Sequence, residues 1–477
     1  MAGTLQGTPG YSLQPSAQKQ TLSTNYITDF NFLNQYLPDT YEKEFERYGN
    51  RSVASFLRAV GAEMPSTSDL IKWAEQGRLH TKYTNCTTDA TLNADTATFT
   101  VDDVLNPATT TTTGIAFRAG QTVFISDNTT SSSISNKAII TDVDYTAGTF
   151  DVAFYEASGI GVAGAGKTFT CFVYGSEFKK GTTGMTESLE ANDDIFENSP
   201  IIIKDKYAVS GSDMAQIGWI EVTTENGATG FLWYIKSEHE TRLRFEDYLE
   251  MAMIEAVPAE AGSGAANAGS NPVFGNKGSE GMFYVVGNRG NVWSGGNPTA
   301  LVDFDAIIQR LDKQGAIEEN VLFINRQFSF DIDDMLAAQN SYGEGGTSYG
   351  LFDNDKDMAL NLGFTGFRRG YDFYKTDWKY LNDAALRGGI VGGAINGVLV
   401  PAGSTTVYDQ VLGKNAKRPF LHVRYRASET EDRRYKTWIT GSAGGAQTSD
   451  LDAMEVHFLS ERALCTLGAN NFFLFEG

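Results

Sequence analysis

The spacing of hydrophobic residues changes several times along the chain, and each change marks a segment. Residues 1–25 are mostly Gly, Ser, Thr and Gln, with almost no apolar periodicity. Such a segment cannot bury enough apolar surface to order itself. We therefore predict a flexible N-terminal arm over residues 1–25 that becomes ordered on a partner.

Residues 26–83 carry helix signals, which predict a helical N-terminal segment. Ser66 and Asp69 resemble a capping box that opens SDLIKWAEQG, and Gly77 would end this helix. An earlier stretch has an apolar stripe at i, i+3, i+4 and i+7, formed by Val53, Phe56, Leu57 and Val60.

From residue 84 to residue 178 the apolar period drops to two. Thr, Ala, Gly and Asp dominate, and short strand-like runs follow one another with turns between them: ATFTVDD, GQTVFISD, KAIITDVDY, TFDVAFYE and TFTCFVYG. This pattern predicts a compact all-β module, a small barrel or sandwich. The flanking text differs in character, so we expect residues 84–178 to be an insertion.

Residues 195–235 contain a second β pattern, formed by the run IIIKDKYAVSG and the later run GWIEVTTENGATGFLWYI. The longest helix signal comes next, from Ser237 to Ala256. At about 1.5 Å per residue this helix is a rod of about 30 Å. Its apolar stripe consists of Phe245, Tyr248, Leu249, Ala252, Met253 and Ala256.

The rest of the chain mixes helices and strands. Helices are predicted from Asp303 to Gly315 and from FDIDDMLAAQ onward. Strands are predicted at MFYVVGN, NVLFIN, GFRRGYDFYKTD, NGVLVP, LHVRYRA and MEVHFLS. There is no regular βαβ repeat, so the predicted fold class is α+β.

Composition narrows the possible functions. The chain has 477 residues with 38 Lys and Arg against 59 Asp and Glu, a formal charge of −21. This balance argues against nucleic-acid binding and against anionic membranes, because both depend on Lys and Arg. No stretch reaches the roughly 20 apolar residues that span a bilayer, and the first residues do not resemble a signal peptide. We therefore expect synthesis and folding in a cytoplasm.

The chain has few residues suited to catalysis or metal binding. Its three Cys and four His are scattered singly, which predicts neither a disulfide framework nor a zinc site. No Ser/His/Asp or Cys/His spacing indicates a nucleophile with its base. We expect no enzymatic activity, no catalytic residues, no cofactor and no resident metal.

Two motifs suggest ligands and are discounted. Residues 161–168, GVAGAGKT, satisfy the Walker A pattern, but β-type text follows where a helix is needed. A nucleotide-binding enzyme remains an alternative that ATP binding would test. Asp353, Asp355 and Asp357 resemble the start of a calcium loop, yet the sixth and twelfth positions are Met358 and Phe364. A solvated turn is expected there, and the sequence leaves open whether it binds a metal.

The text around the long helix resembles a known family. AVSGSDMAQIGWIEV followed by TGFLWYIKSEHETRLRFEDYLEMAMIEA is similar to the extended loop and spine helix of tailed-bacteriophage major capsid proteins of the Hong Kong-97 type. KWAEQGRLH, NVLFINRQFSFDIDDMLAA and VHFLSERALCTLGANNFFLF resemble further family segments in the same order. The likeness is greatest to the proteins of crAss-like phages. It covers about residues 25–80 and 179–477, and it leaves out residues 84–178.

The resemblance implies a domain plan. It assigns residues 179–236 to the extended loop and 237–295 to the spine helix and the first part of the peripheral domain. Residues 296–401 would form the axial domain. Residues 402–477 would hold the remainder of the axial domain and the closing peripheral strands.

The resemblance also implies a function. The chain would self-assemble into hexamers and pentamers of an icosahedral head, enclosing double-stranded DNA without sequence-specific binding. It would be assembled in the bacterial host cytoplasm and reside in the virion capsid. Its partners would be other copies of itself and portal, scaffold and auxiliary or head-decoration proteins, with no membrane. The alternative is a phage tail, baseplate or surface adhesin that binds host or glycan through the Thr-rich β module.

Subunit contacts are expected where projecting elements carry side chains that could meet a neighbour. The acidic balance would repel packaged DNA from the shell wall. The basic runs Arg424–Arg426 and Arg433–Lys436 are expected at subunit contacts. The hypothesis for the extended loop and the long helix names Tyr207, Val209, Met214, Ile217, Arg242, Arg244, Glu246 and Glu250.

Overall fold

The computed structural model describes most of the chain. The described residues are 56, 63–76, 82–88, 95–101, 115–128, 135–157, 159, 167–185, 193–215, 221–223, 229–266, 275–315, 317–340, 365–409, 414–443, 445 and 447–477. Several sequence predictions lie outside these residues: the arm 1–25, most of the apolar stripe around Phe56, the glycine loop 161–166, Ile217, and the Asp353, Asp355 and Asp357 turn.

The predicted α+β class is confirmed, and the described residues divide into two compact units. Tyr207–Leu243 and Ile439–Glu455 belong to one unit, and the remaining described residues to the other. The first unit contains the short helix α2 (Gly211–Met214) and the antiparallel pair β11 (Glu221–Thr223) and β12 (Thr229–Phe231).

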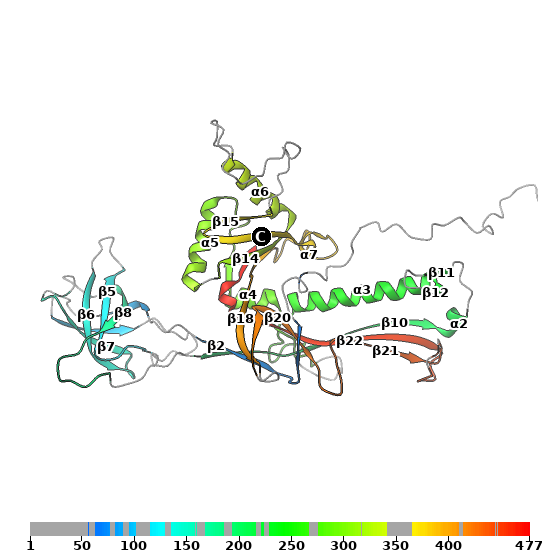
Figure 1. Cartoon of the computed structure of the whole chain (residues 1–477), viewed down its shortest axis with the longest axis horizontal. Helices are drawn as coiled ribbons and strands as arrows, with labels where there is room; N and C mark the ends of the chain where they lie inside the picture. The colour runs from blue at the N-terminus through cyan, green and yellow to red at the C-terminus, as the bar shows by residue number, and fades with distance from the viewer. Residues whose placement is uncertain are drawn as a thin grey trace, which may run out of the picture. The chain divides into compact units, whose positions relative to one another are not determined.

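A closed barrel occupies the segment predicted to be an all-β module (Figure 1). Its strand order is β3-β4-β7-β6-β5-β8. The period-two pattern has a direct cause, because alternate side chains of a strand point into the barrel; β4, for example, alternates exposed and buried residues. The six strands are β3 (Lys82–Thr87), β4 (Thr96–Val101), β5 (Gln121–Asp127), β6 (Ser135–Asp144), β7 (Thr149–Phe154) and β8 (Thr168–Ser176).

The helix predicted over residues 66–77 is wrong. This stretch contains β2 (Ile71–Gln76), which pairs antiparallel with β9 (Asp193–Asn198). Ile71 is buried and Trp73 and Glu75 are half-buried, while the residues between them are exposed. This period of two was hidden by the helix-forming residues Ala, Glu and Gln, and pairing with a strand more than 110 residues away decided the outcome.

A five-stranded sheet follows the order β1-β20-β22-β10, with β21 also paired to β22. Its β1 lies within the segment predicted to be helical, which is a second correction there. β1 runs parallel to β20, whereas β20 and β22 are antiparallel. The strands are β1 (Glu63–Ser66), β10 (Ile201–Ser210), β20 (Leu421–Arg426), β21 (Lys436–Gly441) and β22 (Ala453–Thr466).

A six-stranded sheet follows the order β13-β23-β17-β14-β16-β15. It combines strands from residues 291–401 with the last strand of the chain, so it crosses the predicted domain limits. Its strands are β13 (Asn291–Trp293), β14 (Glu319–Ile324), β15 (Gly366–Arg369), β16 (Tyr371–Asp377), β17 (Ile395–Pro401) and β23 (Phe473–Glu476). A separate antiparallel pair is formed by β18 (Ser404–Asp409) and β19 (Lys414–Pro419).

Helices differ from the sequence predictions at several places, α3 (Leu232–Glu255) and α4 (Met282–Arg289) among them. The long helix α3 starts five residues before the predicted start. α4 replaces a predicted strand. MFYVVGN is a short apolar run, and such a run does not distinguish a buried helix from a strand. The other helices are α5 (Leu301–Gln314), α6 (Arg326–Asn340), α7 (Lys379–Asn382) and the 3-10 turn η3 (Ala469–Asn471).

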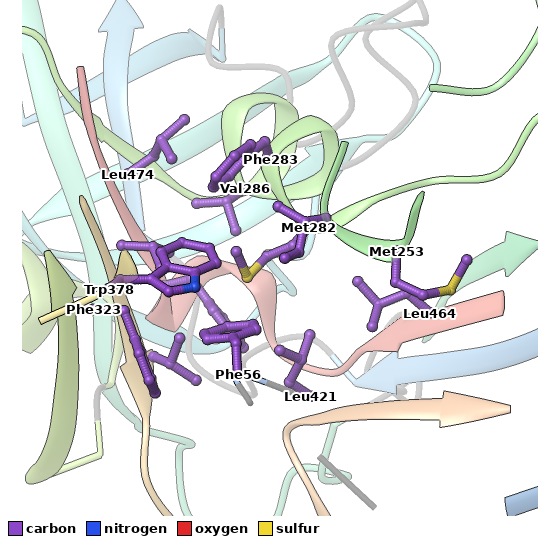
Figure 2. Packing of buried hydrophobic residues seen from close by; sticks show 14 of the residues in the cluster. Phe56, Met253, Met282, Phe283, Val286, Phe323, Trp378, Leu421, Leu464 and Leu474 are labelled. Atoms are coloured by element: carbon purple, nitrogen blue, oxygen red, sulfur yellow. The ribbon is translucent and has the colours of Figure 1, made fainter. Parts of the chain in front are cut away.

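The largest hydrophobic core joins segments that are distant in sequence. Figure 2 shows Phe56 packed with Phe323 and Trp378, whose rings have centroids 4.5 Å and 4.6 Å from that of Phe56. Met253 of α3, Met282 of α4 and Leu464 of β22 belong to the same cluster. A second core fills the barrel, and a third lies at the six-stranded sheet. The barrel therefore has an apolar core of its own.

Candidate functional site

The long helix α3 packs on the five-stranded sheet through one stripe. Phe245, Leu249 and Met253 recur every four residues and are buried, because that spacing places them on one helix face. The Phe245 ring lies 5.7 Å from the Phe458 ring of β22 and 5.3 Å from the Tyr435 ring, between centroids. Because this stripe faces the sheet, the charged residues of α3 lie on its other faces.

The charged helix residues of the contact hypothesis do not share one environment. Arg242 and Arg244 are exposed; Arg242 pairs with Glu238 at 3.7 Å and Arg244 with Asp205 of β10 at 3.0 Å. Glu250 is only 4% exposed, and its Oε1 accepts a hydrogen bond from the Phe56 backbone N–H at 2.9 Å. Glu250 therefore has an internal role in this chain and leaves the set of candidate contact residues.

The other residues named in the contact hypothesis also differ in how deeply they are buried. Val209 is 5% exposed, so it too leaves the candidate set. Tyr207, Met214 and Glu246 are half-buried. Desolvation raises the pKa of the Tyr207 phenol, which is typical of a ring partly enclosed by its own chain. Neighbour contact stays a prediction for Arg242 and Arg244 above all.

A network of ion pairs, which we call the β1 clasp, fastens β1 and the following turn to the sheet. Glu63 binds both Arg434 and Arg462, the latter at 3.4 Å. Glu461 binds Arg433 at 2.8 Å and Arg426 at 3.6 Å. The clasp consists of Glu63, Asp69, Arg426, Arg433, Arg434, Glu461 and Arg462.

The clasp changes the interpretation of the basic runs. Arg426, Arg433 and Arg434 were expected to meet neighbouring subunits, but their carboxylate partners lie in the same chain. Sequence spacing did not reveal this, because the partner acids come from β1 and β22, about 370 residues and about 30 residues away. Sheet order brings them together.

The buried His422 gives this sheet a pH dependence. Desolvation lowers the pKa of His422 from 6.5 to about 4, and Arg424 and Arg418 act in the same direction; its Nδ1 lies 3.2 Å from the Pro419 carbonyl oxygen. The folded chain therefore resists protonation, so stability is complete above pH 6.5 and falls as the pH drops toward about 4. A shift of this size corresponds to about 3 kcal/mol.

We expect the free energy of unfolding to fall by about that amount over this range, measured by urea denaturation at stepped pH values. His422→Asn should flatten the fall. His239→Asn, a change at an exposed histidine of α3, should leave it intact. If both variants followed the wild-type curve, His422 would not be its source.

The Walker-like lysine is engaged in the barrel. The ammonium of Lys167 lies 3.0 Å from Oδ2 of Asp127, whose side chain is fully buried. Lys167 is followed directly by the strand β8 (Thr168–Ser176) and not by a helix. The phosphate-binding geometry of a helix N-terminus is therefore missing from this described part of the motif.

For Lys167→Ala we predict two results. The barrel should lose about 1–3 kcal/mol, because a buried carboxylate loses a charged partner. Calorimetric titration with Mg-ATP should show no binding before or after the change. The control is Lys137→Ala, which removes an ammonium placed 5.6 Å from the centroid of the exposed Tyr174 ring and should cost little. ATP binding that disappears with Lys167 would support the nucleotide alternative.

The barrel carries exposed aromatic side chains on its outer surface. Phe172 and Tyr174 of β8 are 37% and 49% exposed, and Tyr155 is 50% exposed. The Tyr155 hydroxyl donates to Glu177 at 2.5 Å. The barrel core is complete without these rings, so they are available for binding.

Within the described residues, no His, Cys, Asp and Glu side chains form a group of three or more suited to a metal ion. No described helix is long and apolar enough to cross a membrane. All three cysteines are unpaired thiols.

The chain was compared with known proteins. No protein-family model and no curated protein sequence matches it. A solved structure titled "Microbacterium phage Oxtober96" is similar with TM-score 0.41 and 10% identity, covering 94% of this chain and 99% of that one. One titled "Capsid of native GTA particle computed with C5 symmetry" has TM-score 0.41 and 8% identity, covering 95% and 98%.

A third, titled "Capsid structure of the Cyanophage P-SCSP1u", has TM-score 0.38 and 7% identity, covering 93% of each chain. These low scores and identities do not by themselves establish a family.

Proposed function

We propose that the chain is a shell-forming structural protein, the major capsid protein of a tailed bacteriophage of the Hong Kong-97 type. The observation that carries this proposal is the 24-residue helix α3 lying on an extended sheet by one narrow stripe, with Arg242 and Arg244 exposed. Two of the family-like segments, AVSGSDMAQIGWIEV and TGFLWYIKSEHETRLRFEDYLEMAMIEA, occur in this same part of the chain. A protein that covers area needs such long elements, which complete their burial against neighbours.

The finer proposal follows the sequence resemblance. Copies associate into hexamers and pentamers of an icosahedral head that encloses double-stranded DNA, and the chain belongs with the proteins of crAss-like phages. Assembly takes place in the bacterial host cytoplasm with portal, scaffold and auxiliary proteins, and the chain has no enzymatic role. Closed symmetry from repeated identical contacts is the general rule for such oligomers.

Electron microscopy and analytical ultracentrifugation of the expressed full chain test this proposal. Shells, or rings of five and six copies, are the expected result. A protein that remains a compact monomer at all concentrations and salt conditions, with or without a co-expressed phage scaffold, would overturn it.

A second candidate function is binding through the barrel, as in a tail, baseplate or surface adhesin. The exposed rings of Tyr155, Phe172 and Tyr174 favour it, since aromatic residues are enriched at binding surfaces.

The barrel can be removed cleanly. Gln76 and Asp193 are opposite each other in the β2–β9 pair, so an Asn-Gly turn can replace residues 77–192. If the chain is a shell protein, the deleted form should still assemble. If it is an adhesin, the deletion should abolish attachment to host cells while the remaining chain stays folded.

A further inference from the structure

Large side chains form a row across the outer wall of the barrel. Strands β6, β5 and β8 are neighbours there (Figure 1), and Phe124 of β5 lies opposite Phe172 of β8 on one side and Lys137 of β6 on the other. Residues that lie opposite each other in paired strands share a face. The adjacent residues Val123 and Cys171 are fully buried in the barrel core, so the row points away from that core.

Two tyrosines extend the row. The Lys137 ammonium lies over the Tyr174 ring, 5.6 Å from its centroid. Tyr155 directly follows β7, and its backbone N–H donates to the Lys137 carbonyl oxygen at 3.2 Å, which places the two residues side by side. Desolvation, followed by the hydrogen bond to Glu177, raises the pKa of the Tyr155 phenol to about 12, and Tyr174 acts in the same direction. The phenol is therefore a neutral hydroxyl at physiological pH.

The rings of this row contact one another and remain open to solvent. The Phe124 and Phe172 rings have centroids 5.2 Å apart and planes inclined by 38°, and Phe172, Tyr174 and Tyr155 each expose more than a third of their surface. Apolar surface that stays exposed as one patch marks a binding site more often than single exposed residues do. We call this patch the barrel aromatic face: Phe124, Lys137, Tyr155, Phe172, Tyr174 and Glu177.

We propose that the barrel aromatic face binds neutral oligosaccharides, whose sugar rings lie on the aromatic rings. The π face of an aromatic ring is electron-rich and attracts the polarised C–H groups on the flat side of a sugar. Lys137, Tyr155 and Glu177 supply the few donors and acceptors that would orient the sugar hydroxyls. Oligosaccharide binding here rests on the second candidate function, binding through the barrel, and does not depend on whether the chain forms shells.

The charge of the barrel favours a neutral ligand. Residues 82–178 contain four Lys and Arg residues against ten Asp and Glu residues, so the barrel as a whole repels anionic polymers. Lys137 and Lys82, which lies opposite Phe172 on β3, are the basic residues of the row. Two lysines neutralise about two phosphates or sulfates, which is too few to hold such a polymer against that repulsion.

The closure of the barrel argues against a peptide that adds as a further strand. β3 pairs with both β4 and β8, which closes the ring of six strands. Strand addition needs a free edge, and a closed barrel has none. A ligand must therefore bind through side chains alone. Oligosaccharides bind in this way to the strand faces and loops of other small barrels.

The test removes exposed rings and keeps the barrel core. The face variant is Phe172→Ala with Tyr174→Ala. The control is Phe330→Ala with Tyr374→Ala, which removes one Phe and one Tyr that are 51% and 52% exposed outside the barrel. Titration calorimetry of the full chain uses cellohexaose, maltohexaose and chitohexaose, with dextran sulfate and single-stranded oligothymidylate as anionic comparisons. Circular dichroism and thermal unfolding confirm that each variant is folded.

We expect at least one of the three neutral hexasaccharides to bind the wild type. The face variant should bind it about tenfold or more weakly, and the control by less than about twofold. Tyr155→Phe, which keeps the ring and loses the hydroxyl, should weaken binding less than the face variant does. No binding of any neutral hexasaccharide to the folded wild type, unchanged binding by the face variant, or tighter binding of an anionic polymer would each overturn the proposal.

Attachment to host cells separates the proposal from the function on which it rests. If deletion of residues 77–192 leaves attachment unchanged, the second candidate function fails and the titration alone decides on oligosaccharide binding. If the deletion abolishes attachment but periodate oxidation of the host-cell sugars does not, the barrel binds a protein and the oligosaccharide assignment is wrong. Loss of attachment in both experiments supports the assignment.

Discussion

Replacing Phe245 with alanine is expected to lower the free energy of unfolding by about 3–5 kcal/mol. Phe245 is fully buried, and its ring contacts both Phe458 and Tyr435. Truncation leaves a cavity between α3 and the sheet. Urea denaturation followed by circular dichroism measures the loss.

The matched control is Tyr248→Ala on the same helix. Tyr248 is 42% exposed, so its truncation should cost less than about 1 kcal/mol. If the shell proposal is right, Phe245→Ala should also reduce the yield of assembled particles well below that of Tyr248→Ala. Equal losses from the two variants would mean that the Phe245 stripe does not hold the helix to the sheet.

Replacing Glu63 with alanine should cost about 3 kcal/mol, whereas Asp69→Ala should cost less than about 1 kcal/mol. Both acids belong to the β1 clasp, but their partners differ in burial. Glu63 binds Arg462, whose side chain is 7% exposed, and Asp69 is itself 69% exposed. Without Glu63, the buried guanidinium of Arg462 loses a carboxylate partner. Desolvation already lowers the pKa of this guanidinium.

Arg462 keeps two hydrogen bonds in the Glu63→Ala variant, donated to Ser460 Oγ at 2.9 Å and to the Arg434 carbonyl oxygen at 3.1 Å. These limit the loss to the lower part of the range for a broken buried pair. Glu63→Gln should cost less than Glu63→Ala because the amide oxygen still accepts a bond. Thermal unfolding of the three variants decides the order, and a cost for Asp69→Ala as large as that for Glu63→Ala would refute the role of burial.

Much of the fold was predictable because local spacing reports local structure. Strand-like alternation over residues 84–178 predicted the β module, and inward side chains such as Phe99 and Val123 explain it. The Phe245, Leu249 and Met253 spacing predicted α3. The end of the helix at Gly315 was predicted as well. In the structure Gly315 has φ +78°, a left-handed conformation suited to glycine.

The errors share one physical cause. IKWAEQ has residues that favour a helix, yet it pairs as β2 with β9, and MFYVVGN has residues that favour a strand, yet it forms α4 in the main core. In both places contacts with distant segments contribute more free energy than local propensity, which is worth only tenths of a kcal/mol per residue. Local pattern could not reveal those contacts.

By itself, the sequence determined the α+β class, the inserted all-β module, the long helix and the acidic charge, because each depends on local spacing or composition. Only the tertiary structure decided which charges remain available at the surface. It placed Glu250 against Phe56 and paired Arg426, Arg433 and Arg434 with carboxylates of the same chain. Ion pairing and burial depend on which strands lie side by side, and sheet order is a property of the whole fold.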